Sequence, residues 1–262
     1  MEIILALYGI ENKYKNLEDY ISLKNKLIHT CDNNILISYN DISNFVIGNN
    51  NVEFEHIENN GFMINVEIYN KKDNRNYRGG WSAMPLLDEG KEQVKKLAQY
   101  LGENSKEFNI EKIISSDLER TKETTEIINE KLGAEVEYTD RLREMNNGKI
   151  AGMLNEEVEK KFSGLYYNTL RMDERYPDGE SPIEFHDRII KSFKEIIEEN
   201  KNHENIMIVT HSGVINIIYR YINNMEWSNK IKSVKISNAS IYSLVIDGDK
   251  KYFELENFCE YL

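Results

Sequence analysis

In the last two thirds of the chain, stretches with apolar residues at helical spacing alternate with short apolar runs. Residues 87–101 and 183–199 have apolar side chains every three or four positions, which predicts two amphipathic helices. Their predicted buried faces carry Val94, Leu97, Ala98 and Leu101 in the first helix, and Phe185, Ile189, Ile190, Phe193 and Ile197 in the second. Residues 112–116, 136–138 and 206–209 have the short apolar pattern of strands, and 206–209 is predicted to be the central one.

Local signals complete this pattern. Asp117 is of the type favoured at a helix N-cap, and Gly133 is a natural helix stop, so a helix is predicted between them. Residues 241–246 and 252–255 predict a closing hairpin. The expected fold class is therefore α/β: a three-layer, mostly parallel sheet with helices on both faces and an antiparallel edge.

Residues 1–60 follow this alternation less well. They are predicted to form a small α/β extension or insertion, and residues 61–262 to form the main domain. Within the extension, an apolar strand at the start and a helix over 17–29 are expected. Short strands are expected at 35–38, 44–47 and 52–54.

Composition narrows the function classes. The 262 residues are 40% hydrophobic and 30% charged with three prolines, which supports a packed core and argues against disorder. A net charge of −12 argues against a nucleic-acid or anionic-membrane partner, although a local basic pocket can still bind a small anion. Cys31 and Cys259 lack metal-ligand spacing and suggest a reducing compartment. Without a signal peptide or an apolar span, the expected location is the cytoplasm.

The main candidate for chemistry is His211, in the segment Thr210-His211-Ser212-Gly213 that follows strand 206–209. Open α/β sheets bind ligands at the carboxyl ends of their strands, beside the start of the next helix. A histidine there can carry protons or contact an anion. The alternative is a capping or structural histidine.

Further candidates follow other predicted strands and loops. Arg120 is expected in the first turn of a helix, where a guanidinium and the positive helix end suit a phosphate. The alternative is a solvated arginine paired with Glu119 or Glu123. Glu144 follows a short strand and could protonate a leaving oxygen, or be a surface charge. Ser181 and Pro182 mark a helix start.

The order of these motifs is more specific than any one of them. The motifs are Pro85-Leu86 with Gly90, Ser115–Thr121, Leu142–Glu144, Gly179–Ser181, Thr210–Gly213 and Asn238–Ser240. Over roughly residues 62–256 this succession resembles the histidine phosphatase superfamily, also called phosphoglycerate-mutase-like. The resemblance implies that family's α/β fold and catalysis through a phosphohistidine, with no metal or other cofactor.

Roles follow from the resemblance, residue by residue. Arg120 would bind phosphate, His211 would stabilise the transferring phosphoryl group, and Glu144 would be the acid. Arg75 and Arg78, in the loop before the first helix, would contact the phosphate or the rest of the substrate.

The nucleophilic motif of the family, Arg-His-Gly at a strand end, is not matched. Met63-Ile64-Asn65 stands in its place in one alignment and Leu7-Tyr8-Gly9 in another, so neither supplies an imidazole. His56 is a third candidate nucleophile, but Glu55 then replaces the arginine and would repel a phosphate. His29, His186 and His203 fit no better.

The sequence therefore favours a pseudophosphatase, a protein that binds a small phosphorylated ligand or a partner with weak or absent catalysis. The first alternative is an active phosphomonoesterase acting on a small phosphorylated metabolite, with a relocated nucleophile. Hydrolysis is favoured over mutase activity, because transfer needs the residues that are missing. A third alternative is a scaffold whose motif residues bind nothing. An oligomer is possible.

Overall fold

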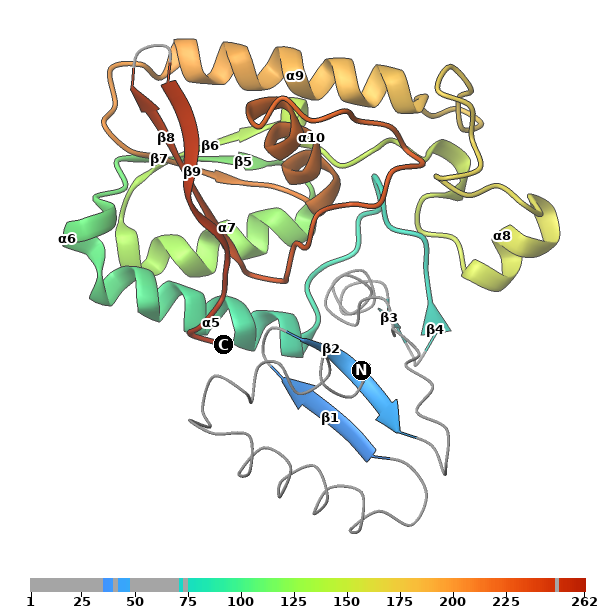
Figure 1. The fold of residues 1–262 in the computed structure, drawn as a ribbon, viewed down its shortest axis with the longest axis horizontal. Coiled ribbons are helices and arrows are strands. Elements are labelled where there is room, and N and C mark those ends of the chain that lie inside the picture. The colour runs from blue at the N-terminus through green and yellow to red at the C-terminus, as the bar shows by residue number, and fades with distance from the viewer. Residues whose placement is uncertain (1–34, 40–41, 48–70, 73–74, 248–249) are drawn as a thin grey trace, which may run out of the picture. The chain divides into compact units, whose positions relative to one another are not determined.

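The computed structural model describes residues 35–39, 42–47, 71–72, 75–247 and 250–262 (Figure 1). The chain divides into two compact units, residues 1–63 and 64–262. In the first unit, β1 (Ile35–Tyr39) and β2 (Ile42–Ile47) form an antiparallel pair, so the strands expected at 35–38 and 44–47 are confirmed. The expected strand at the start, the helix over 17–29 and the strand at 52–54 lie outside the described residues.

The second unit is built on a parallel sheet. Its described strands are β5 (Lys112–Ser116), β6 (Glu135–Thr139) and β7 (Ile206–Val209), in the order β6-β5-β7. Ser115 lies opposite Val209, and Ser116 lies opposite Thr139. The carboxyl ends of all three strands therefore meet at one edge, where this class of sheet binds its ligands.

The middle position in this sheet is held by β5, whereas the sequence predicts it for residues 206–209. Ile113 and Ile114 of β5 are fully buried, while only the last residue of β7 is. Among the described strands, β7 is an outer one. A continuous apolar run shows that both faces of a strand are covered by helices, and it does not distinguish a middle position from an edge.

Helices cover both faces of the sheet, as predicted (Figure 1). On one face, α5 (Asp88–Glu103) and α7 (Glu119–Leu132) pack around Leu97, Ile113 and Ile128. On the other, α9 (Pro182–Glu199) and α10 (Ser212–Ile222) pack around a larger apolar cluster. The shorter elements are α6 (Ser105–Phe108), α8 (Asn155–Lys161), and the 3-10 turns η1 (Asp140–Leu142) and η2 (Gly148–Ile150).

The ends of the helices show which of the predicted cap residues hold cap positions. The signal at the start of α9 is confirmed: the Ser181 hydroxyl accepts from the Glu184 N–H, and the Glu184 carboxylate accepts from the Ser181 N–H. Gly133 ends α7 with φ +64°. The N-cap prediction at Asp117 is wrong. Leu118 holds the cap position, because the Asp117 carboxylate instead forms an ion pair with Arg143.

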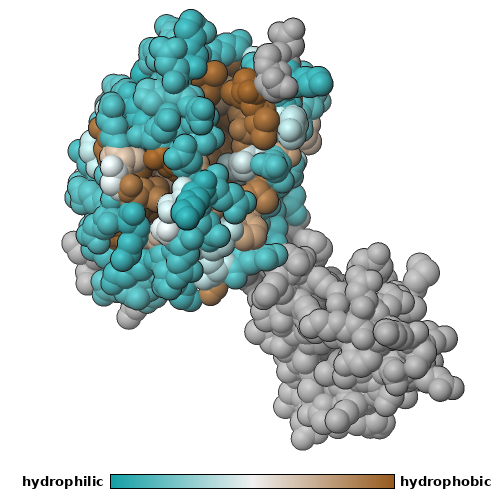
Figure 2. Space-filling model, turned by 90° about the vertical axis from the view of Figure 1, so that its left-hand side faces the viewer, coloured by the Kyte–Doolittle hydropathy of each residue, from teal (hydrophilic) through white to brown (hydrophobic). Residues whose placement is uncertain are grey.

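The chain closes with the predicted hairpin, β8 (Ile241–Asp247) antiparallel to β9 (Lys250–Phe258). Two short strands, β3 (Lys71–Lys72) and β4 (Arg75–Asn76), pair before the first helix. Figure 2 shows that apolar side chains also gather in a hollow on one face, within an otherwise polar surface. Among the described helices, none has the length and apolarity needed to cross a membrane.

Candidate phosphate-binding site

His211 lies at the edge of the sheet where β5 and β7 end. Its Nε2 is 2.8 Å from the hydroxyl of Ser116, and both side chains are buried. His211 holds the N-cap position of α10, but its side chain bonds Ser116 and makes no cap hydrogen bond. Burial first, and then the positive charges of Arg120 and Arg188, lower the pKa of His211 well below its ordinary value. The imidazole is therefore neutral at pH 7.

Arg120 is buried in the first turn of α7, only 4% exposed. Its guanidinium donates to the backbone oxygens of Gly80 (3.0 Å) and Ser82 (3.5 Å). The alternative partner Glu123 is occupied elsewhere, since its carboxylate accepts from Leu86 N–H at 2.6 Å and pairs with a lysine. The described contacts therefore connect the guanidinium to the loop at residues 80–82. Its positive charge also lowers the pKa of His211.

Glu144 lies at the start of α10. One carboxylate oxygen accepts from the N–H of Gly213 at 3.1 Å, and the other from its neighbour Met145 at 3.0 Å. A Cβ at position 213 would clash with Glu144 Oε1, so the glycine permits this close approach. A carboxylate here meets the positive end of the helix and its free N–H groups, which are also the groups that bind an oxyanion.

Arg120, Glu144 and His211, which come from three distant segments, thus converge on one edge of the sheet. Thr210 reinforces the arrangement, because its hydroxyl donates to the Leu142 carbonyl at 2.9 Å and joins β7 to the Glu144 segment. The site offers a neutral imidazole, a buried guanidinium, a carboxylate and a helix N-terminus. Together these can bind a phosphoryl group, since the guanidinium and the N–H donors suit its oxygens.

Trp81 and Arg188, which were not predicted from the sequence, both hold the Glu144 backbone. Trp81 donates from its indole N–H to the Glu144 carbonyl at 2.6 Å, and the Arg143 guanidinium lies over the indole ring at 4.6 Å. Arg143 is itself fixed by Asp117 at 2.5 and 2.6 Å. The Trp81 contact joins loop to loop across the fold, so its spacing in the sequence carries no signal.

Arg188, on α9, is the other missed residue. It pairs with Glu180, which is 8% exposed, and donates to three carbonyls of the Glu144 segment. The Gly179–Ser181 motif did mark Glu180, but only as part of a helix start. Glu180 precedes α9 and Arg188 lies in its second turn, so no short-range spacing in the sequence marks the pair.

Of the remaining predicted site residues, one has a described side-chain contact with another group, and two lie outside the described side chains. Arg78 packs over the ring of Tyr166, with its guanidinium carbon 5.0 Å from the ring centroid. Arg75 is described only as backbone, in β4. His56 lies outside the described residues.

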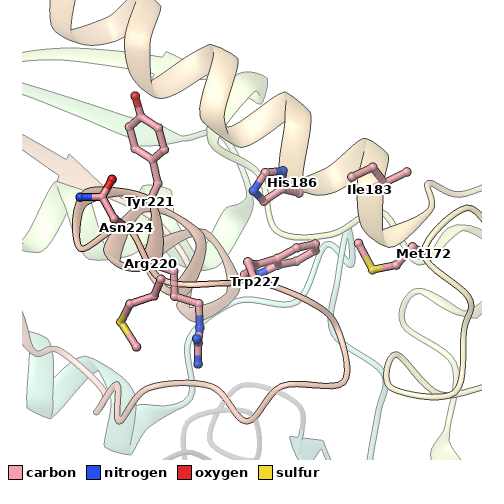
Figure 3. Close-up of a pocket in the computed structure, with 8 residues that line it drawn as sticks. Met172, Ile183, His186, Arg220, Tyr221, Asn224 and Trp227 are labelled. Carbon is pink, nitrogen blue, oxygen red and sulfur yellow. The ribbon is translucent and has the colours of Figure 1, made fainter.

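A separate apolar pocket of about 370 Å³ lies at the far end of α10 (Figure 3). It is lined by Met172, Ile183, His186, Arg220, Tyr221, Asn224, Met225 and Trp227. His186 stacks on Trp227 with ring centroids 4.7 Å apart. The Arg220 guanidinium donates to two backbone carbonyls at 2.7 and 2.8 Å, so it serves the local fold. The pocket therefore differs in chemistry from the Arg120 site.

Comparisons with known proteins identify the family. Residues 69–258 match the Histidine phosphatase superfamily (branch 1), and the chain belongs to this family. Phosphoglycerate mutase-like protein 4 of Arabidopsis thaliana is 34% identical over 169 residues, covering 63% of this chain and 70% of that protein. Within the described residues, no group of three or more His, Cys, Asp and Glu side chains is placed to hold a metal ion.

Solved structures share the fold at lower identity. The α-ribazole phosphatase of Shigella flexneri has a TM-score of 0.59 and 20% identity, covering 70% of this chain and 88% of that one. A mycobacterial glucosyl-3-phosphoglycerate phosphatase in complex with inorganic phosphate has a TM-score of 0.57 and 20% identity, covering 72% and 94%. The chain thus has the α/β fold of the histidine phosphatases.

Proposed function

We propose that this chain binds the phosphoryl group of a small phosphorylated molecule at Arg120, Glu144 and His211, and that it hydrolyses such esters weakly or not at all. The observation that carries the proposal is the convergence of these side chains at the carboxyl ends of β5 and β7. A buried guanidinium beside a helix N-terminus supplies positive charge and N–H donors, which suit a phosphoryl oxygen.

Weak catalysis is inferred from the histidines. The chain has five, and the family mechanism needs an imidazole nucleophile in addition to the one that binds the phosphoryl oxygens. Of the described ones, His186 stacks on Trp227 and His203 precedes β7, at the opposite end of that strand from His211. In a catalytic unit whose members act together, loss of the nucleophile costs about as much as loss of the whole unit.

The ligand class is inferred from the similar proteins and from the net charge. The relative and the structural neighbours carry names that refer to phosphoglycerate, glucosyl-3-phosphoglycerate and α-ribazole. For this chain we infer the shared feature, a small phosphorylated metabolite. The net charge of −12 favours such a ligand over nucleic acid or an anionic membrane.

The second candidate function is an active phosphomonoesterase. It is favoured by the carboxyl group at the site, since Glu144 in its protonated form would give its proton to the leaving alkoxide, beside the neutral imidazole of His211. The nucleophile would then be His56, or another histidine brought to the site. Attack by its nitrogen on phosphorus would break the ester P–O bond, and water would later release phosphate.

One set of measurements separates the two functions. Hydrolysis of para-nitrophenyl phosphate is followed for the full chain and for His56→Ala and His211→Ala, with inorganic phosphate binding measured by calorimetry. Binding without turnover in any sample supports the proposal. Turnover that is lost in His56→Ala establishes the active enzyme and contradicts weak catalysis. Absence of both binding and turnover overturns both functions and leaves a scaffold.

A further inference from the structure

Arg188 holds the Glu144 segment through three of its backbone carbonyls. Its Nη1 donates to the carbonyls of Arg141 (3.1 Å) and Arg143 (3.0 Å), and its Nη2 to that of Glu144 (3.2 Å). The same guanidinium forms a two-point ion pair with Glu180, at 2.7 and 3.2 Å. A single side chain therefore fixes the turn that carries the proposed acid.

Glu180 extends this control to the other side of Glu144. Its Oε1, which accepts from Arg188, also accepts from the backbone N–H of Asn146 at 2.7 Å. The backbone is thus held before, at and after Glu144 by one connected pair. Glu180 is 8% exposed, and a charged hydrogen bond of this kind in a buried place is worth more than one in water.

Arg188 also contributes charge to the site. The groups that face His211 are Arg120 from α7, Ser116 from β5 and Arg188 from α9, while Glu144, from the loop after η1, contacts the first turn of α10. The positive charges of Arg120 and Arg188 both oppose protonation of His211 and so lower its pKa, after the larger effect of burial. Arg188 therefore acts on the carboxylate and on the imidazole.

We propose that Arg188 is a positioning residue of the oxyanion site: it fixes the backbone around Glu144 and supplies positive charge next to His211 without itself contacting the bound oxyanion. This inference rests on the proposed phosphoryl binding. Lysine at this position would keep the charge, but it has no planar fork and cannot serve three carbonyls and a carboxylate together. Methionine would remove both the positive charge and the hydrogen bonds. The two substitutions therefore separate charge from positioning.

The test is sulfate binding by calorimetry from pH 5 to pH 8, with the full chain and Arg188→Lys, Arg188→Met and Arg141→Met. Sulfate keeps the same charge over this range, so changes report the protein. Arg141 is the matched control: it lies in the same turn, but its guanidinium pairs with Glu199 on the surface at 2.9 and 3.0 Å. Circular dichroism at each pH confirms that the variants are folded.

The expected wild-type result is an affinity that rises as the pH falls, because protonated His211 adds a positive charge to the site. Arg188→Met should move this rise to higher pH and weaken binding at pH 8 roughly three- to tenfold. Arg188→Lys should keep the midpoint of the rise but bind more weakly. Arg141→Met should match the wild type in both respects.

Four results would overturn the inference. A pH profile and affinity of Arg188→Met equal to those of Arg141→Met would show that Arg188 has no role in the site. A midpoint moved equally in Arg188→Lys would exclude its charge as the cause. If Arg188→Met does not fold, unchanged affinity in Arg188→Lys overturns the positioning role. No sulfate or phosphate binding by the wild type would instead overturn the proposed function, and this inference with it.

Discussion

Glu144 and Gly213 are joined by a 3.1 Å hydrogen bond from the backbone N–H of Gly213 to the Glu144 carboxylate. The bond places a carboxylate at the first turn of α10, two residues beyond His211. The same helix end is expected to receive an oxyanion, so a bound phosphoryl group and Glu144 share the N–H donors of this turn. Several expectations can be derived from this arrangement.

Replacing Gly213 with alanine should displace Glu144, because the added Cβ would clash with Glu144 Oε1. We expect Gly213→Ala to change phosphate affinity with little effect on the urea midpoint, because the displaced atom is the movable end of the Glu144 side chain. Gly102→Ala is the control: that glycine lies within α5, where an added Cβ meets Lys131 Cβ at an ordinary 3.4 Å. Alanine there should be neutral or stabilising by up to about 1 kcal/mol. Equal behaviour of the two variants would contradict the role given to Gly213.

The depressed pKa of His211 predicts a pH dependence of stability. The unfolded chain binds a proton near pH 6.5, whereas the buried imidazole binds one only at lower pH. Between about pH 6.5 and the lower pKa of the folded state, the unfolded chain binds more protons than the folded one. The free energy of unfolding should therefore decrease as the pH is lowered through this range. Above about pH 6.5 the histidine is neutral in both states and contributes nothing to the pH dependence.

Urea unfolding at several pH values between 5 and 7.5 measures this effect in the wild type and His211→Gln. The slope attributable to this one group is at most about 1.4 kcal/mol per pH unit. The variant should have a flatter profile than the wild type. Identical slopes in the two proteins would show that His211 titrates normally and is not buried as a neutral imidazole.

Trp81 should report on ligand binding through its fluorescence. Its indole donates to the Glu144 carbonyl and carries the Arg143 guanidinium over its ring, so changes at Glu144 alter its surroundings. The chain has two tryptophans, and Trp227 lies in the separate apolar pocket. We expect phosphate to change the emission of Trp227→Phe, which keeps Trp81, and not that of Trp81→Phe. A response that follows Trp227 would place binding in the pocket instead.

The capping box at the start of α9 predicts a stability effect without a binding effect. Ser181→Ala removes the hydroxyl that accepts from Glu184 N–H, which should cost about 1 kcal/mol in the free energy of unfolding. Phosphate affinity should stay near that of the wild type, since the described hydrogen bond of this hydroxyl is the cap bond with Glu184. A large loss of affinity at unchanged stability would show that Ser181 belongs to the binding site.

Much of the fold was predictable from the sequence, because the spacing of apolar residues and the residue preferences of turns and helix ends depend on neighbouring positions in the chain. The spacing of Val94, Leu97 and Leu101 gave a helix whose buried face is the predicted one. Asp117 shows the limit of such reasoning. Its type favours an N-cap, but the bidentate contact with Arg143, 26 residues away, is stronger than the cap hydrogen bond.

The site was predictable only where side chains follow strand ends. Arg120, Glu144 and His211 do so, and the parallel sheet brings strand ends together. Trp81 and Arg188 reach the site from a loop and from the second turn of a helix, through contacts 63 and 44 residues apart in sequence. Their identities carry no motif, since a tryptophan or an arginine at such positions is usually a packing or surface residue.

The central claim is that Arg120 makes this edge of the sheet a phosphoryl-binding site, and calorimetry of inorganic phosphate with the wild type, Arg120→Met and Arg171→Met tests it most directly. Arg171 is the control because it is exposed and pairs with Asp173 at 2.9 Å. We predict binding by the wild type and Arg171→Met, and at least roughly tenfold weaker binding by folded Arg120→Met, as expected for loss of a charged hydrogen bond. Equal affinity in all three proteins would contradict the claim.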